Sequence, residues 1–170
     1  AWTASGGVLL YIESAAVVGR PGFKLTGQLG EVMQESAGIA FSFVRGWAVA
    51  NQTIKAAWFN HHHLHLHVPA GAVPKDGPSA GITMACSLLS LVRNVPLRQD
   101  VAMTGELSLA GNVLPIGGLK EKIIAAKRAG IRIIVIPRDN TPDLEKIPAY
   151  IKKGMTFRPV GLVEEVFLIA

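Results

Sequence analysis

Residues 117–136 read GGLKEKIIAAKRAGIRIIVI, and this stretch decides the class of fold. Leu119 and Ile123 recur at helical spacing, and Gly130 is placed to end the helix just after its last turn. The run Ile131–Ile136 is rich in β-branched residues, which favours a central strand. A helix followed at once by such a strand indicates an α/β or a mixed α+β domain.

Strand and helix patterns alternate irregularly through the rest of the chain. The expected strands are residues 8–18, 23–26, 63–68, 131–136 and 156–160, together with a hairpin of 101–109 and 112–116 around Ala110–Gly111. The expected helices are 30–52, 80–92, 118–129, a short one starting at Pro142, and 162–169. We therefore expect one compact α/β domain, residues 1–170, with mixed sheets and flanking helices.

The composition excludes several classes of protein. With 49% hydrophobic and 17% charged residues in a chain of 170, disorder is excluded and a sizeable core is expected. The apolar excess is expected to face partner subunits, since no apolar stretch is long enough for a membrane span. The net charge of +5 is spread without a basic block, which speaks against a nucleic-acid patch. The one cysteine, Cys86, excludes an internal disulfide and suits a reducing compartment.

A candidate nucleophile lies in residues 74–81, which read PKDGPSAG. Ser79 stands between a Pro/Gly turn and the start of a helix that is apolar nearly all round. Free backbone N–H groups and the positive end of the helix dipole would surround its hydroxyl, an arrangement that can serve a nucleophile beside an oxyanion hole. A plain N-cap serine would look the same and would serve stability alone.

A candidate base lies in the helix expected after Gly118. At 100° per residue, Lys122 falls inside the apolar arc, whereas Lys120 falls on the opposite side with Lys127. Burial and a position near the helix start both lower the pKa of a lysine, so Lys122 could accept a proton from a serine hydroxyl. The alternative is a lysine whose stem lies on the core and whose ammonium reaches solvent.

Five histidines gather between residues 61 and 67. His63, His65 and His67 would share one face of a strand, which suits a polar face, a zinc site or a Ser–His pair. No carboxylate or cysteine lies nearby in the sequence, so no metal site is expected. The role of His61, His62 and His63 stays open.

Four stretches occur in an order that resembles the proteolytic domain of Lon proteases, across essentially the whole chain from Gly7. They are Leu29–Ser36, Pro74–Gly81, Ala102–Glu106 and Leu114–Lys122. The resemblance implies a serine endopeptidase with a Ser–Lys dyad, Ser79 as nucleophile and Lys122 as base, and no catalytic histidine. It also implies that Thr104 bonds the lysine amine, that Asp76 lies beside the cleft, and that His65 and His67 are structural.

The family resemblance implies more than this chain carries. Lon proteins add an ATPase module that uses ATP and Mg²⁺, and no phosphate-loop motif occurs here, so we expect an isolated protease domain without a cofactor. The family implies unfolded polypeptide substrates, a homo-oligomer in the form of a hexameric ring, and a bacterial cytoplasm or organelle matrix as location. No nucleic acid or membrane partner is expected.

The expected reaction is acyl transfer. Neutral Lys122 takes the proton of Ser79, and the backbone N–H groups of Ser79 and Ala80 hold the oxyanion. Two rival hypotheses stay open: an anion- or ATP-binding domain of the GHMP-kinase type, with Gly77–Gly81 as its phosphate turn, and a non-enzymatic assembly module.

Overall fold

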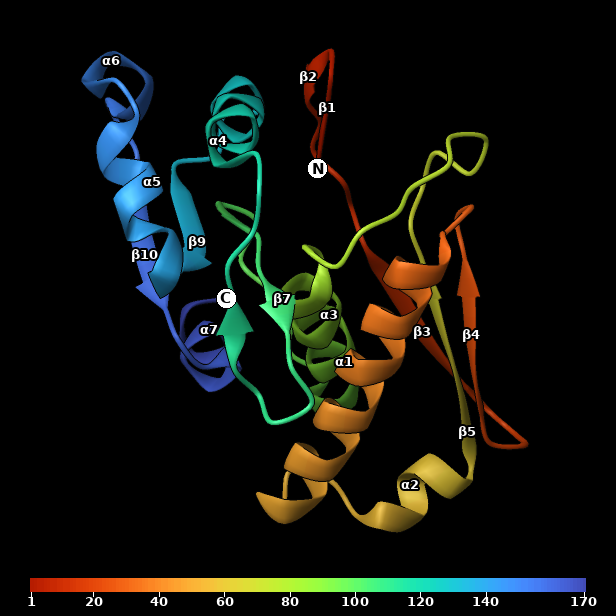
Figure 1. Ribbon diagram of the computed structural model, residues 1–170. Helices are drawn as coiled ribbons and strands as arrows, with labels where there is room; N and C mark the ends of the chain where they lie inside the picture. The colour runs from red at the N-terminus through yellow and green to blue at the C-terminus, as the bar shows by residue number, and fades with distance from the viewer.

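The computed structural model describes residues 1–170 and confirms the expected α/β class, with mixed sheets and flanking helices. The first half of the chain forms an N-terminal hairpin and a three-stranded sheet covered by helices (Figure 1). These elements are β1 (Trp2–Thr3), β2 (Gly6–Gly7), β3 (Glu13–Val18), β4 (Gly22–Thr26), α1 (Glu31–Ala50), α2 (Ala56–Asn60), β5 (His62–His67) and α3 (Gly81–Arg93).

The second half builds another three-stranded sheet and the helices that lie beside it. Its elements are β6 (Val101–Met103), β7 (Glu106–Leu107), β8 (Val113–Leu114), α4 (Leu119–Arg128), β9 (Ile133–Pro137), a 3₁₀ turn η1 (Arg138–Asn140), α5 (Thr141–Lys146), α6 (Ala149–Lys152), β10 (Thr156–Val160) and α7 (Val163–Ile169). None of the helices has both the length and the hydropathy that crossing a membrane requires.

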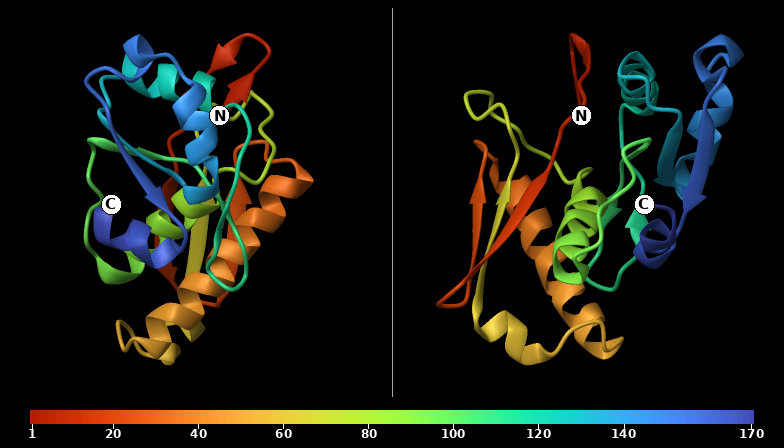
Figure 2. Two further views of the ribbon diagram at one scale, coloured as in Figure 1. Left: turned by 60° about the vertical axis from the view of Figure 1, so that its left-hand side comes forward. Right: turned by 180° about the vertical axis from the view of Figure 1, so that it is seen from behind.

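The layers follow from which faces are apolar. In the sheet β3–β5–β4, Leu64 and Leu66 of β5 are fully buried on the helix side, against α1 and α3. The alternate residues His63, His65 and His67 face the other side, as the period of two requires. The helix pair separates this sheet from β10–β9–β6, and the view from behind shows the same order (Figure 2).

Strand β9 divides the interior into two cores. It is the central strand of its parallel sheet, as its β-branched sequence predicts. Val135 packs into the larger core of 22 buried residues, whereas Ile134 and Ile136 pack into a core of 7 with α4, α5 and α6. The two cores therefore meet at this sheet, and helices from both sides approach its edge.

Two expected strands are shorter in the structure. Residues 8–12 are not part of a ladder, because β5 ends opposite Glu13 at His67 and then turns away at Pro69. The hairpin expected over 101–116 is limited to β7 and β8, since Val101–Met103 pairs in parallel with β9 instead. Helices α2 and α6 and the hairpin of β1 and β2 were not expected from the sequence.

Candidate active site

Ser79 lies in the turn that leads into α3 and lines a cleft of about 640 Å³. The helix begins at Gly81 with Ala80 as its N-cap residue, and no side chain caps it. The interpretation of Ser79 as a plain N-cap is therefore wrong. The N–H groups of Ser79 and Ala80 have no partner within the chain, whereas the next N–H, that of Gly81, bonds the carbonyl of Pro78. The backbone N–H groups of Ser79 and Ala80, on either side of the Ser79 Cα, are thus both free to donate.

Lys122 reaches the same cleft from α4, which packs on the opposite face of β9 from α3. It is half-buried and Lys120 is exposed, as the helical spacing predicts. Of the 24 residues that line the cleft 16 are hydrophobic, and desolvation in these surroundings lowers the pKa of Lys122 to about 8. A substantial fraction of this amine is therefore neutral near physiological pH.

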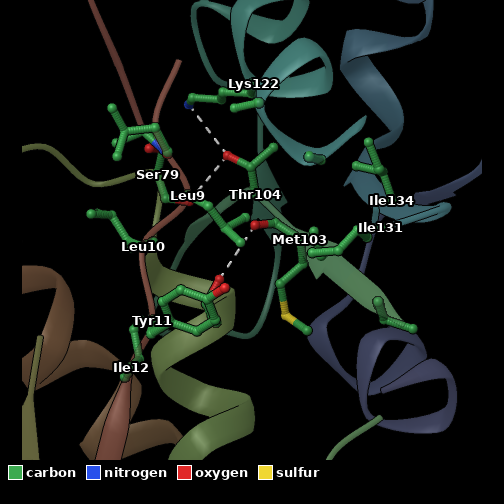
Figure 3. A pocket seen from close by; sticks show the side chains of 18 of the residues that line it. Leu9, Leu10, Tyr11, Ile12, Ser79, Met103, Thr104, Lys122, Ile131 and Ile134 are labelled. Atoms are coloured by element: carbon green, nitrogen blue, oxygen red, sulfur yellow. Dashed lines mark hydrogen bonds between the residues drawn. The ribbon is translucent and has the colours of Figure 1, made fainter. Parts of the chain in front are cut away.

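Thr104 joins the two candidates, as Figure 3 shows. The Lys122 ammonium donates to Thr104 Oγ1 at 3.3 Å, and this hydroxyl donates to the carbonyl oxygen of Ser79 at 3.3 Å. Both distances are longer than the usual range for such bonds, so each bond is weak. Thr104 itself is buried, and its N–H bonds the carbonyl of Val135 in β9. The structure therefore connects Ser79 and Lys122 through Thr104, and no hydrogen bond joins their side chains directly.

Asp76 lies at the rim of the cleft and shapes the loop before Ser79. Its Oδ1 accepts the N–H of Met33 at 2.9 Å and that of Gly77 at 2.8 Å. Met33 is the third residue of α1, a helix whose own N-cap, Gly30, supplies no side chain. Asp76 therefore caps α1 although it lies in another segment, and its bond to Met33 joins the loop before Ser79 to that helix.

The histidines do not enter the cleft. Thr26 Oγ1 lies 2.7 Å from His65 Nε2 and 2.7 Å from His67 Nδ1, and both rings lie on the sheet face away from the helices. No group of three side chains of the kinds that ligate metals comes together anywhere in the chain. His62 stacks on Trp58, and its Nδ1 donates to the carbonyl oxygen of Trp58 at 2.7 Å, so this histidine serves the packing of α2.

Sequence reasoning missed one buried cation beside the site. Lys75 is 8% exposed, and its ammonium donates to three backbone carbonyls. It lies in a loop, where no periodicity indicates which side chains point inward. The only available signal was its place four residues before Ser79.

A serine beside free N–H donors, with a lysine of lowered pKa across the cleft, is the arrangement that serine hydrolases with a lysine as general base use. The model of the family described as Lon protease (S16) C-terminal proteolytic domain matches residues 1–170. The chain belongs to the Lon protease family, to which its C-terminal proteolytic domain model assigns all 170 residues.

Individual Lon proteases are similar in sequence to this chain over its whole length or nearly so. It is 52% identical over 170 residues to the Lon protease of Treponema pallidum (strain Nichols), covering 100% of this chain and 19% of the relative. It is 54% identical over 170 residues to that of Syntrophus aciditrophicus (strain SB), covering 100% and 21%. The Lon protease of Leptospira interrogans is 53% identical over 169 residues, covering 99% and 20%. The chain thus spans about a fifth of the length of these relatives.

Proposed function

We propose that Ser79 and Lys122 form the catalytic dyad of this peptidase. The observation that carries the proposal is the placement of both residues in one apolar cleft, where burial holds the pKa of Lys122 near 8. An amine with this pKa can take the proton of a serine hydroxyl at neutral pH. Thr104, which accepts a bond from the amine, keeps it at the cleft wall beside the nucleophile loop.

The reaction then proceeds in two half-reactions. Ser79 Oγ attacks the scissile carbonyl as its proton passes to Lys122, and the free N–H groups of Ser79 and Ala80 hold the oxyanion. The Lys122 ammonium returns its proton to the leaving amine, which departs and leaves an acyl-enzyme. Water, deprotonated by Lys122, hydrolyses the acyl-enzyme and restores Ser79. No residue of this scheme needs a metal or a cofactor.

The dyad is tested with a fluorophosphonate, which phosphonylates an activated serine. Wild-type protein should carry one adduct, on a peptide that contains Ser79, and should hydrolyse an unfolded peptide. Ser79→Ala should lose both the adduct and the hydrolysis, whereas Ser90→Ala, a serine of the same helix region outside the cleft, should keep both. An adduct on another residue, or hydrolysis by Ser79→Ala, would contradict the proposal.

For the whole protein we propose a longer chain in which residues 1–170 are the proteolytic domain beside an ATPase module. Support comes from the relatives, whose length is about five times the part matched here. In that setting the substrates are unfolded polypeptides and the domains assemble as a hexameric ring. A reducing compartment, the bacterial cytoplasm or an organelle matrix, suits the free and buried Cys86.

A further inference from the structure

The loop before the nucleophile contains a buried charge that the reaction does not use. The Lys75 ammonium donates to the carbonyls of Gly27 at 2.7 Å, Ala70 at 2.8 Å and Val73 at 2.9 Å. An ammonium has three donors, so all of them are engaged. No carboxylate pairs with it, since the ion pairs of the chain involve other residues. Three neutral acceptors therefore offset the cost of burying this charge.

The three carbonyls belong to two separate parts of the fold. Gly27 directly follows β4, whereas Ala70 and Val73 lie in the loop that leads from β5 to α3 (Figure 1). Ala70 has a φ of 67°, a left-handed conformation that costs a non-glycine residue about 1 kcal/mol. The Lys75 ammonium bonds the carbonyl of Ala70 in its own loop and that of Gly27 after β4. These bonds fold the loop back on itself and join it to the sheet.

The backbone of Lys75 is fastened at the same place. Its N–H bonds the carbonyl of Gln28 at 2.9 Å, and its carbonyl accepts the N–H of Gly30 at 2.7 Å. The next residue, Asp76, caps α1. The segment from Lys75 to the first turn of α3 is therefore fixed at its Lys75 end, and Ser79 lies within it.

We propose that Lys75 is a positioning residue for the nucleophile: its ammonium, by gathering three carbonyls, selects the loop conformation that presents Ser79 to Lys122. The inference rests on the proposed dyad. Lys75 is not a second base, because it does not line the cleft and each of its protons is engaged. A buried ammonium is stable only while all three carbonyls surround it, so alternative loop conformations are disfavoured.

The test compares two side chains of equal length that differ only in the ammonium. Lys75→Cys is alkylated with 2-bromoethylamine, which rebuilds the lysine chain with sulfur in place of one methylene, or with 1-iodopropane, which gives the neutral counterpart. Because position 75 is buried, the alkylation is carried out on the unfolded chain, which is then refolded. Cys86→Ala in the same background, including the wild-type control, removes the competing native thiol. Mass spectrometry confirms a single modification, and Lys75→Met is the genetically encoded neutral variant.

The propylated protein and Lys75→Met should lose about 10–100-fold in kcat, since displacing a reacting group by about 1 Å can cost that much. Their KM should stay within about two-fold, and the midpoint of their pH profile should not move, because Lys122 and the apolar wall of the cleft are unchanged and only the loop that carries Ser79 shifts. The aminoethylated protein should regain most of the wild-type kcat. Lys152→Met removes a lysine that also bonds a carbonyl, that of Leu144, away from the cleft, and should keep wild-type kcat.

Three results would overturn the inference. A propylated protein with wild-type kcat would show that the ammonium is dispensable. A shifted pH midpoint would make Lys75 part of the proton transfer. Loss of the thermal transition in the neutral variants would mean that Lys75 serves the fold as a whole. Failure of the dyad is distinguished from these because wild-type protein would then carry no adduct on Ser79.

Discussion

Lys122 can act as a base only when its amine is neutral, and its surroundings decide at which pH that occurs. Desolvation lowers the pKa of Lys122 to about 8. Activity should therefore rise as pH increases through about 8 and level off above it, about two units below the pH at which an exposed lysine would deprotonate. Initial rates of peptide hydrolysis between pH 6 and 10 give this midpoint.

Substitutions at the two neighbouring lysines separate base from surface charge. Lys122→Ala and Lys122→Arg should both lose about 10²–10⁴-fold in kcat, because a guanidinium keeps its proton in proteins. Lys120→Ala should be nearly silent, since that side chain is exposed on the same helix. Near wild-type rates for Lys122→Arg, or a dead Lys120→Ala, would show that the base is assigned to the wrong residue.

Lys122 and Lys75 show how far sequence reasoning reaches at the scale of single residues. Helical periodicity distinguishes Lys122 from Lys120, because a helix turns by a fixed angle per residue. No such rule applies to Lys75, whose burial depends on carbonyls from residues 27, 70 and 73. Likewise the family resemblance named Thr104, but only the structure shows that its N–H is held by β9.

At the scale of elements, α1 depends on a residue of another segment for its cap. Asp76→Ala should lower the free energy of unfolding by about 1 kcal/mol, the usual cost of a lost N-cap. Asp76→Asn should lose less, because its amide oxygen can accept the same N–H groups of Met33 and Gly77. Urea unfolding of the three proteins measures both differences, and equal stabilities would refute the capping role.

Two histidines of strand β5 lie against a hydroxyl group on the neighbouring strand β4. Thr26 binds one ring nitrogen of His65 and one of His67, which leaves no converging set of ligands. Treatment with a chelator should therefore leave peptidase activity unchanged. Activity lost in EDTA and restored by zinc would revive a metal role for His63, His65 and His67.

Local patterns predicted most elements but not their partners. The β-branched run of β9 and the alternation of β5 are visible in the sequence, and both strands form where expected. The strand β6 was expected in a hairpin because Ala110–Gly111 offers a turn. Its pairing with β9, about thirty residues later, depends on packing that no local signal encodes.

At the scale of the whole domain, we predict that residues 1–170 by themselves do not bind a nucleotide. No phosphate-loop motif occurs in residues 1–170. In the turn at Gly77–Gly81, the N–H of Gly77 already donates to Asp76, and Ser79 is the proposed nucleophile. Isothermal calorimetry of this chain with Mg·ATP should show no binding. Tight binding would favour the kinase-like hypothesis over the peptidase for this turn.

The division of the interior by β9 also has a consequence for how the protein responds to heat. Ser79 is attached to the core of 22 buried residues, whereas Lys122 is attached to the core of 7. The unit with less apolar burial opens at a lower free energy, so the two halves of the dyad belong to cooperative units of unequal stability. Amide hydrogen exchange should be faster in α4–α6 than in α1 and α3. Peptide hydrolysis should fail on heating several degrees below the main far-UV circular dichroism transition, where only the smaller signal of α4–α6 is lost. Equal protection of both units from exchange would mean that the chain unfolds only as a whole. Unequal protection would mean that thermal inactivation is local unfolding of α4–α6, which cooling reverses.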